Sequence, residues 1–108
     1  MISKDALEHH TKLLAALAND KRLQIMRIIS EHEVGVGDLT EKVGLSQSAL
    51  SQHLARLRND ELVSTRRDAQ NIYYSTTHPG VRKILDSLLT IELGSDPAGA
   101  LDGPPETL

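Results

Sequence analysis

Residues 43–57, VGLSQSALSQHLARL, constrain the fold of this chain more than any other stretch of its sequence. Gly44 can adopt the positive φ that ends a helix, and Ser46 is well placed to cap the helix that follows. The sequence therefore predicts a helix over 38–43 and a second over 47–58, joined by a short turn as in a helix-turn-helix. At about 100° per residue, three side chains of the second helix form one apolar stripe facing the core: Leu50, Leu54 and Leu57.

The opposite side of the second helix carries small or amide side chains, with no acidic residue between Ser46 and Asn59. Small side chains let a helix sit deep in the DNA major groove, where Gln can pair with adenine and Ser with several base edges. The N-terminal part of such a helix faces the bases. A solvated amphipathic helix is the alternative, although such a face normally carries Glu and Lys. We predict that Arg56, further along the same side, contacts a phosphate. The residues predicted to contact bases are Gln47, Ser48, Ser51 and Gln52.

A hairpin with a basic rim follows this helix. Residues 63–67 and 72–76 are predicted as two strands, and residues 68–71 supply the turn between them. A helix-turn-helix followed by a hairpin is the pattern of a winged helix-turn-helix, whose wing tip can meet phosphates or the minor groove. The alternative is a routine charged hairpin in which Arg67 pairs with Asp68. The wing residues predicted to contact DNA are Arg66, Arg67 and Gln70.

The whole sequence predicts a mainly helical fold with a two-stranded β wing. Apolar residues recur at helical spacing over 5–18 and 21–32 before the helix-turn-helix, and over 79–93 after the wing. The chain has two Tyr and neither Phe nor Trp, so its core must be built from aliphatic side chains. Tyr73 and Tyr74 are adjacent, and in a strand one of them should pack on the core while the other points outward.

One domain over residues 1–93 accounts for these elements, and residues 94–108 are predicted to be a flexible acidic tail. The formal net charge of −3 is unusual for a protein that binds DNA. The tail carries three of the fifteen acidic residues and no basic one, which leaves twelve acids and twelve bases elsewhere. DNA binding depends on a local basic face rather than on the net sign, so this balance predicts modest non-specific affinity.

The first and last predicted helices carry more apolar surface than a domain of this size needs for its own core. Exposed apolar stripes usually mark an interface. We predict a two-fold homodimer through the terminal helices, which sets two recognition helices one DNA turn apart. Packing of these helices onto their own core is the alternative. The predicted interface residues are Leu7, Leu14, Leu85, Leu88 and Leu89.

No residue pattern supports catalysis, a metal or a cofactor. The five His are dispersed, and the one adjacent pair, His9 and His10, would diverge by about 100° on a helix. There is no Ser/His/Asp order, phosphate-cradling Gly loop or pair of catalytic carboxylates, so we do not expect an enzyme. No apolar run approaches the roughly 20 residues that span a bilayer. The absence of Cys fits a reducing cytoplasm.

Three segments resemble the ArsR/SmtB family of repressors, and in particular its NolR-like branch. Residues 17–26 are similar to the start of the family's second helix, residues 44–54 to its recognition helix, and residues 63–75 to its wing. The resemblance covers residues 13–93. It implies a dimeric winged-helix repressor, whose base-facing and wing positions fall on the residues already singled out.

The sequence departs from this family at its metal site. Many members sense metals through an ELCVCDL-type motif, whereas residues 33–39 read EVGVGDL and place Gly35 and Gly37 at the two cysteine positions. Soft-metal or thiol-based sensing needs sulfur ligands, and the chain has none from Cys. The last helix also lacks the family's zinc-site spacing, because two residues after Asp86 comes Leu88 in place of His.

Together these features predict a cytoplasmic, homodimeric transcriptional regulator that binds double-stranded operator DNA of palindromic sequence without a metal. The resemblance implies that it represses, by occupying the operator and blocking the polymerase. Two alternatives remain open. One is a winged-helix module that binds a protein partner, and the other is a metal sensor that uses His and carboxylate ligands.

Overall fold

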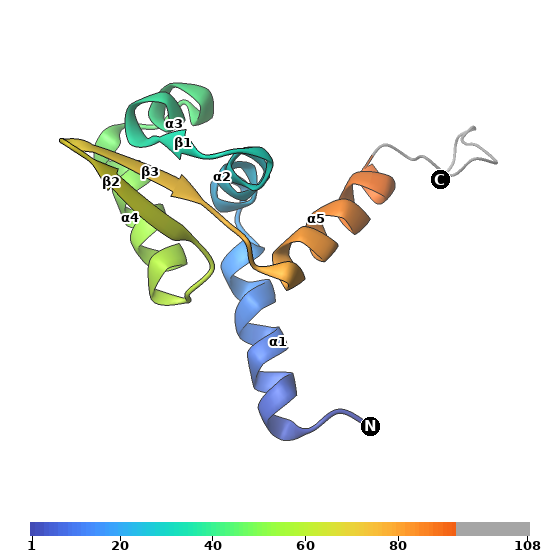
Figure 1. Ribbon diagram of the computed structural model, residues 1–108. Helices are drawn as coiled ribbons and strands as arrows, with labels where there is room; N and C mark the ends of the chain where they lie inside the picture. Colours follow the sequence, from blue (N-terminus) through green and yellow to red (C-terminus); the bar gives the residue numbers. More distant parts are fainter. Residues whose placement is uncertain (93–108) are drawn as a thin grey trace, which may run out of the picture. The chain divides into compact units, whose positions relative to one another are not determined.

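A computed structural model describes residues 1–92 of the chain, and the predicted tail over 94–108 lies outside them. The described residues fall into two compact units, residues 1–78 and the part that begins at Pro79. The first unit contains α1 (Lys4–Leu17), α2 (Asp20–Glu31), β1 (Val34–Gly35), α3 (Val36–Val43), α4 (Gln47–Asn59), β2 (Ser64–Asp68) and β3 (Asn71–Ser75). The second consists of α5 (Pro79–Glu92) (Figure 1).

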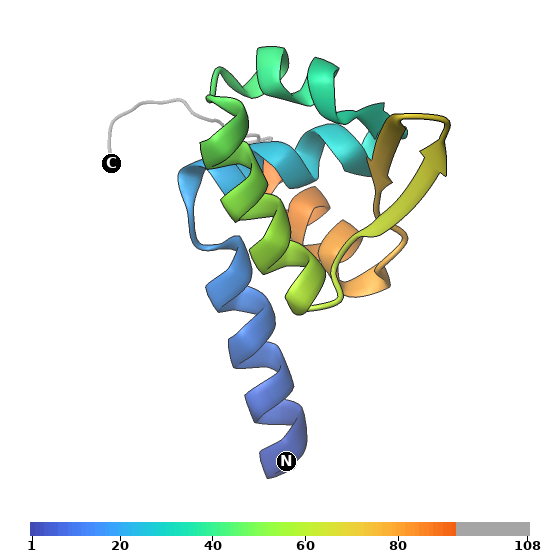
Figure 2. The same cartoon turned by 90° about the vertical axis from the view of Figure 1, so that its left-hand side faces the viewer.

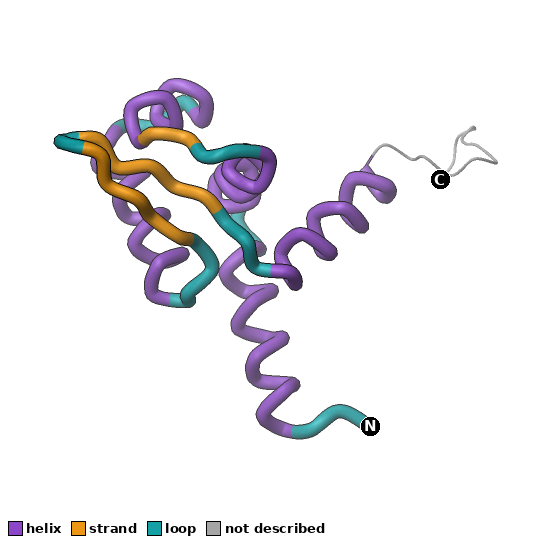
Figure 3. The backbone as a smooth tube through the Cα atoms, in the orientation of Figure 1, coloured by secondary structure: helices purple, strands orange, loops and turns teal. Residues whose placement is uncertain are grey.

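The first unit has three strands rather than the predicted two, because β1 joins the hairpin. The strand order is β1-β3-β2 and both pairings are antiparallel (Figure 3). Asp68 pairs with Asn71, so the turn between β2 and β3 is only Ala69-Gln70, with Ala69 at φ +59°. No strand was predicted over residues 34–35 from the sequence. A two-residue strand that includes Gly has no periodicity of its own and exists here through its pairing with β3.

The core of the first unit is aliphatic, as predicted. The stripe on α4 is buried as expected, with Leu50, Leu54 and Leu57 nearly inaccessible to solvent. Tyr74 is buried and Tyr73 is half-buried, which follows from their alternation along β3. Each helix of this unit adds further buried side chains, among them Leu13, Ala16, Leu17, Ile25, Met26, Ile29, Leu39 and Val43.

The turn between α3 and α4 is built from the residues that predicted it. Gly44 lies in the left-handed region at φ +73°, and its amide donates to the Thr40 carbonyl oxygen at 2.9 Å. Ser46 Oγ accepts a hydrogen bond from the Ala49 amide at 3.1 Å and caps α4. Lys21 Nζ donates to the carbonyl oxygen of Val43, which ties the end of α3 to α2. In Figure 2 α3 and α4 follow one another, whereas the first turns of α1 extend away from the rest of this unit.

The end of α4 is a Schellman turn with a residue other than glycine in its left-handed position. The Leu62 amide donates to Leu57 O at 3.0 Å and the Glu61 amide donates to Arg58 O at 2.9 Å, which is the hydrogen-bond pair of this motif. Leu57 and Leu62 are both buried and supply the apolar contact that usually accompanies it. Glu61 has φ +58°, where an L side chain is strained and glycine is not.

The variant Glu61→Gly is therefore expected to raise the free energy of unfolding by about 0.5–1 kcal/mol, after the larger backbone entropy of Gly in the unfolded chain is subtracted. Urea denaturation followed by circular dichroism measures this as a higher midpoint with an unchanged slope. Glu61→Ala is the matched control, because it removes the same carboxylate and keeps the strained backbone. Equal midpoints for the Gly and Ala variants would contradict the explanation by backbone strain.

Candidate nucleic-acid interface

The first two turns of α4 present an uncharged polar face to solvent. The helix begins at Gln47, directly after the Ser46 cap, and its buried leucines turn the other side outward. The four side chains predicted to contact bases are all exposed, namely Gln47, Ser48, Ser51 and Gln52. No acidic residue lies within α4, so this face can approach a polyanion without local charge repulsion.

The far end of α4 is joined to the wing by a hydrogen bond between side chains. Arg58 Nη1 donates to the hydroxyl oxygen of Tyr74 at 2.6 Å, and Tyr74 lies in the central strand β3. The bond is part-buried, since Tyr74 is buried and Arg58 is exposed, and it ties the end of the helix to the sheet. Nothing local in the sequence indicates this role for Arg58, since its partner lies 16 residues away.

Arg56 is only partly available for a phosphate. Its Nε donates to Asp60 Oδ2 at 3.0 Å, one helical turn further on, and the Arg56 side chain remains 44% exposed. The Arg22 guanidinium interacts electrostatically with both Arg56 and Asp60. Its pKa is lowered by burial and by the positive charge of Arg56, and is raised to a smaller extent by Asp60. The Asp60 carboxylate thus interacts with two cations, Arg22 and Arg56. A phosphate would have to compete with Asp60 for the guanidinium of Arg56.

The two arginines of the wing differ in what they contact. Arg66 is bound by the Glu33 carboxylate, from its Nε at 3.0 Å and its Nη2 at 2.8 Å. Arg67, the next residue along β2, pairs in register with Ile72 and is exposed. Within residues 1–92 its side chain makes no hydrogen bond or ion pair, so the Arg67–Asp68 pairing of the alternative interpretation does not form. The wing therefore has one engaged and one available guanidinium.

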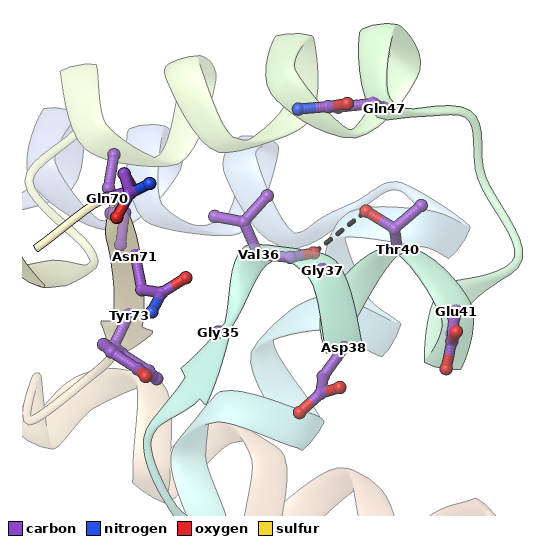
Figure 4. A pocket seen from close by; sticks show the side chains of 11 residues that line it. Gly35, Val36, Gly37, Asp38, Thr40, Glu41, Gln47, Gln70, Asn71 and Tyr73 are labelled. Carbon is purple, nitrogen blue, oxygen red and sulfur yellow. Dashed lines mark hydrogen bonds between the residues drawn. The ribbon is translucent and has the colours of Figure 1, made fainter. Parts of the chain in front are cut away.

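An open groove of about 680 Å³ separates the helix-turn-helix from the wing (Figure 4). Gln47 of α4 lines one side, and Gln70 and Asn71 of the hairpin line another. Asp38 and Glu41 line the part formed by α3. Amide groups can donate and accept hydrogen bonds, whereas the two carboxylates disfavour a phosphate inside the groove. Two predicted DNA contacts, Gln47 and Gln70, are thus brought to one hollow by elements distant in sequence.

The predicted interface leucines differ in exposure. On α1, Leu7 is 54% exposed and Leu14 is 55% exposed, while Leu13 and Leu17 of the same helix are buried. On α5, Leu89 is exposed and Leu88 is half-buried, whereas Leu85 is only 5% exposed within a single chain. The α1 helix therefore has two apolar faces, of which one belongs to the core and the other faces solvent.

The His residues do not gather into a metal site. The ring centroid of His9 is 6.3 Å from that of His10 and 6.3 Å from that of His78. In the part of the chain from residue 1 to 92, no three His, Cys, Asp or Glu side chains converge as metal ligands. At the cysteine positions of the family motif, Gly35 lies in β1 and Gly37 lies in the first turn of α3. Over the same range no helix is long and apolar enough to cross a membrane.

The capped polar helix, the preceding short helix and the adjacent hairpin define a winged helix-turn-helix regulator that binds DNA. The model of one family, described as the arsR family of bacterial regulatory proteins, matches residues 19–65. Solved structures of that fold superpose on most of the chain, one of them at 51% sequence identity over the aligned part. The chain belongs to the ArsR family of transcriptional regulators.

Proteins of this family are similar to the chain both in sequence and in structure. The nodulation protein NolR of Rhizobium meliloti is 59% identical over 78 residues, which are 72% of this chain and 64% of NolR. The transcriptional activator HlyU of Vibrio cholerae is 47% identical over 76 residues, 70% of each chain. The crystal structure of NolR from Sinorhizobium fredii superposes with a TM-score of 0.77 at 51% identity, covering 84% of this chain and 94% of that one. The predicted family resemblance and winged fold are confirmed.

Proposed function

We propose that the protein is a cytoplasmic homodimer that binds a palindromic operator and represses transcription from it. One observation carries this proposal: the exposed, acid-free face of α4 lies across a groove from the wing. In this arrangement Gln47, Ser48, Ser51 and Gln52 read base edges in the major groove. Arg67 and Gln70 of the wing contact the flanking backbone or minor groove.

The charge balance of the chain and the apolar face of α1 support a dimer. Outside the tail the chain has twelve acidic and twelve basic residues, so one near-neutral copy would neutralise few phosphates and bind weakly. Two copies on one duplex add their contacts, and the second copy binds at a high effective concentration. Leu7 and Leu14 are exposed large apolar side chains on α1, of the kind that an interface between copies would cover.

Repression is proposed from the family resemblance, because occupation of an operator blocks the polymerase sterically. The relatives include both activators and repressors by name. HlyU is called a transcriptional activator, and a relative in Xylella fastidiosa is called a biofilm growth-associated repressor. A reporter gene placed behind the operator determines the sign for this chain. Lower expression in the presence of the protein is expected.

Selection of bound fragments from a random double-stranded DNA library tests the binding itself. We expect a pseudo-palindrome whose half-site centres are about one helical turn apart, in keeping with two recognition helices on one face of the duplex. Affinity for the selected site, followed by fluorescence anisotropy, should fall as salt rises, since bound phosphates release counterions. Failure to enrich any sequence, together with the absence of a salt-sensitive complex, would contradict the proposal.

A further inference from the structure

We propose that Glu33, Arg66 and Tyr73 form a clamp that sets the position of the wing against the helix-turn-helix, so that Arg66 supports operator binding without contacting DNA. This inference rests on the proposed function and assigns Arg66 a different role from Arg67. It replaces the expectation that both arginines of the wing meet phosphates. The three residues come from three separate segments of the sheet region.

The clamp crosses the whole sheet. Tyr73 of the central strand β3 lies in register with Gly35 of β1 on one side and with Arg66 of β2 on the other. The guanidinium carbon of Arg66 lies 4.6 Å from the centroid of the Tyr73 ring. Beyond that ring, Arg66 reaches the Glu33 carboxylate through two hydrogen bonds of 3.0 and 2.8 Å. The outer strand is thereby bound to the residue just before β1.

Gly35 makes room for this arrangement. A Cβ atom at that position would lie 3.3 Å from Cε1 of Tyr73, closer than most such contacts in proteins. The Tyr73 ring therefore lies against the backbone of β1, and a side chain there would press on it. Glu33 is two residues before Gly35, a spacing that in extended chain puts both on the same face. Glycine, ring, guanidinium and carboxylate thus follow one another on one face.

The contacts of the clamp fix the orientation of the Arg66 side chain and add little to the global free energy of unfolding. Exposed ion pairs contribute little to folding, and here the Arg66 and Glu33 side chains are 53% and 37% exposed. A two-point guanidinium–carboxylate contact is nevertheless specific in geometry, and the aromatic ring restricts it further. Hydrogen bonding to Arg66 lowers the pKa of Glu33, and Glu33 raises the pKa of Arg66. Both partners are therefore charged at neutral pH.

The position of β1 explains why such a clamp would matter for DNA. Gly35 ends β1 and is also the N-cap residue of α3, the first helix of the helix-turn-helix. A link from β2 to the start of β1 consequently connects the outer wing strand to α3, which is followed by the helix α4 that carries Gln47. On the opposite face of β3, at the next residue along the strand, the Arg58–Tyr74 hydrogen bond connects β3 to α4. The wing is thus held to the helix-turn-helix at two places.

Salt dependence distinguishes a phosphate contact from a clamp. Affinity for the selected operator is measured by fluorescence anisotropy over a range of salt for the wild type, Arg66→Ala and Arg67→Ala. Arg67→Ala should lower the slope of log affinity against log salt by about one, as expected for one lost phosphate contact. Arg66→Ala should leave the slope unchanged and weaken binding roughly three- to tenfold, since its contribution is through coupling.

The Glu33→Ala variant gives opposite signs for the two explanations. If Glu33 acted only by its charge, its removal would strengthen binding to a polyanion. The clamp predicts weaker binding, similar to Arg66→Ala, and a double variant no weaker than either single one because both break the same contact. Arg66→Lys keeps the charge and loses the two-point contact, so it should behave like Arg66→Ala.

Hydrogen exchange tests the clamp without DNA. The amides of β2 and β3 should exchange faster in Arg66→Ala and Glu33→Ala, while those of α2 and α4 keep wild-type protection. Stronger operator binding by Glu33→Ala, a slope lowered by one in Arg66→Ala, or unchanged exchange in the wing would each overturn the clamp and leave the proposed function standing. The absence of any salt-sensitive complex for the wild type would contradict the proposed function, and hydrogen exchange would still decide on the clamp.

Discussion

Ser51→Glu is expected to weaken operator binding by about 100-fold, because it places a carboxylate in the middle of the helix face proposed to enter the major groove. Ser51 is exposed, and one turn before it lie Gln47 and Ser48 of the same face. A negative charge there meets the phosphates on both sides of the groove. Fluorescence anisotropy with the selected operator measures the loss, and circular dichroism with thermal unfolding verifies that the fold is retained.

Two controls separate charge from other effects of this substitution. Ser51→Ala removes the hydroxyl without adding charge, and should cost far less than Ser51→Glu. Ala15→Glu adds the same carboxylate to an exposed position of α1, and should leave operator affinity near that of the wild type. If Ser51→Glu bound DNA like the wild type, the polar face of α4 would not contact DNA. The alternative of a winged-helix module that binds a protein partner would then gain support.

Leu14→Glu is expected to convert the protein to a monomer and to weaken its binding to the palindrome by roughly 100-fold or more, since linked binding of two half-sites is lost. Leu14 is 55% exposed in the single chain, so a carboxylate there should not disturb the core face of α1. In a dimer interface the same charge would be buried without a partner. Sedimentation velocity measures the oligomeric state, and anisotropy measures affinity for the full operator and for one half-site.

The half-site result identifies the cause of the loss. A monomeric Leu14→Glu protein should bind a single half-site about as well as one copy of the wild type, because α4 and the wing are unchanged. Ala15→Glu is again the matched control, since it lies about 100° further round α1 and should remain dimeric. A Leu14→Glu protein that is still dimeric would contradict the role assigned to this face of α1.

Much of this fold could be predicted because its signals are local. The leucine spacing on α4 repeats within three turns, and Gly44 and Ser46 mark the turn by their own backbone and capping preferences. The exposed face of α4 then follows as the side opposite the leucines. No such signal exists for β1, whose two residues are a strand only through Tyr73 and Tyr74 of β3.

The contacts of the two wing arginines could not be predicted from the sequence. A run of Arg66 and Arg67 indicates a basic rim, but alternation along β2 sends the two side chains to different faces. The partner of Arg66 is Glu33, 33 residues earlier, and nothing local to either residue indicates their meeting. The pairing of Arg56 with Asp60 had a signal, since opposite charges four residues apart on a helix commonly interact. A cap of Gly or Asn would have been expected at Glu61, whose conformation is imposed by the packing of Leu57 and Leu62.

The clamp and the Arg58 hydrogen bond also give the protein an intrinsic optical reporter. The chain contains no Trp, and its only two aromatic chromophores of the phenol type are Tyr73 and Tyr74. One lies beneath a guanidinium and the other is buried with its hydroxyl bonded to Arg58. Ultraviolet emission from the unlabelled chain thus originates entirely in β3, and any rearrangement of the hairpin on a duplex can be followed without attaching a dye.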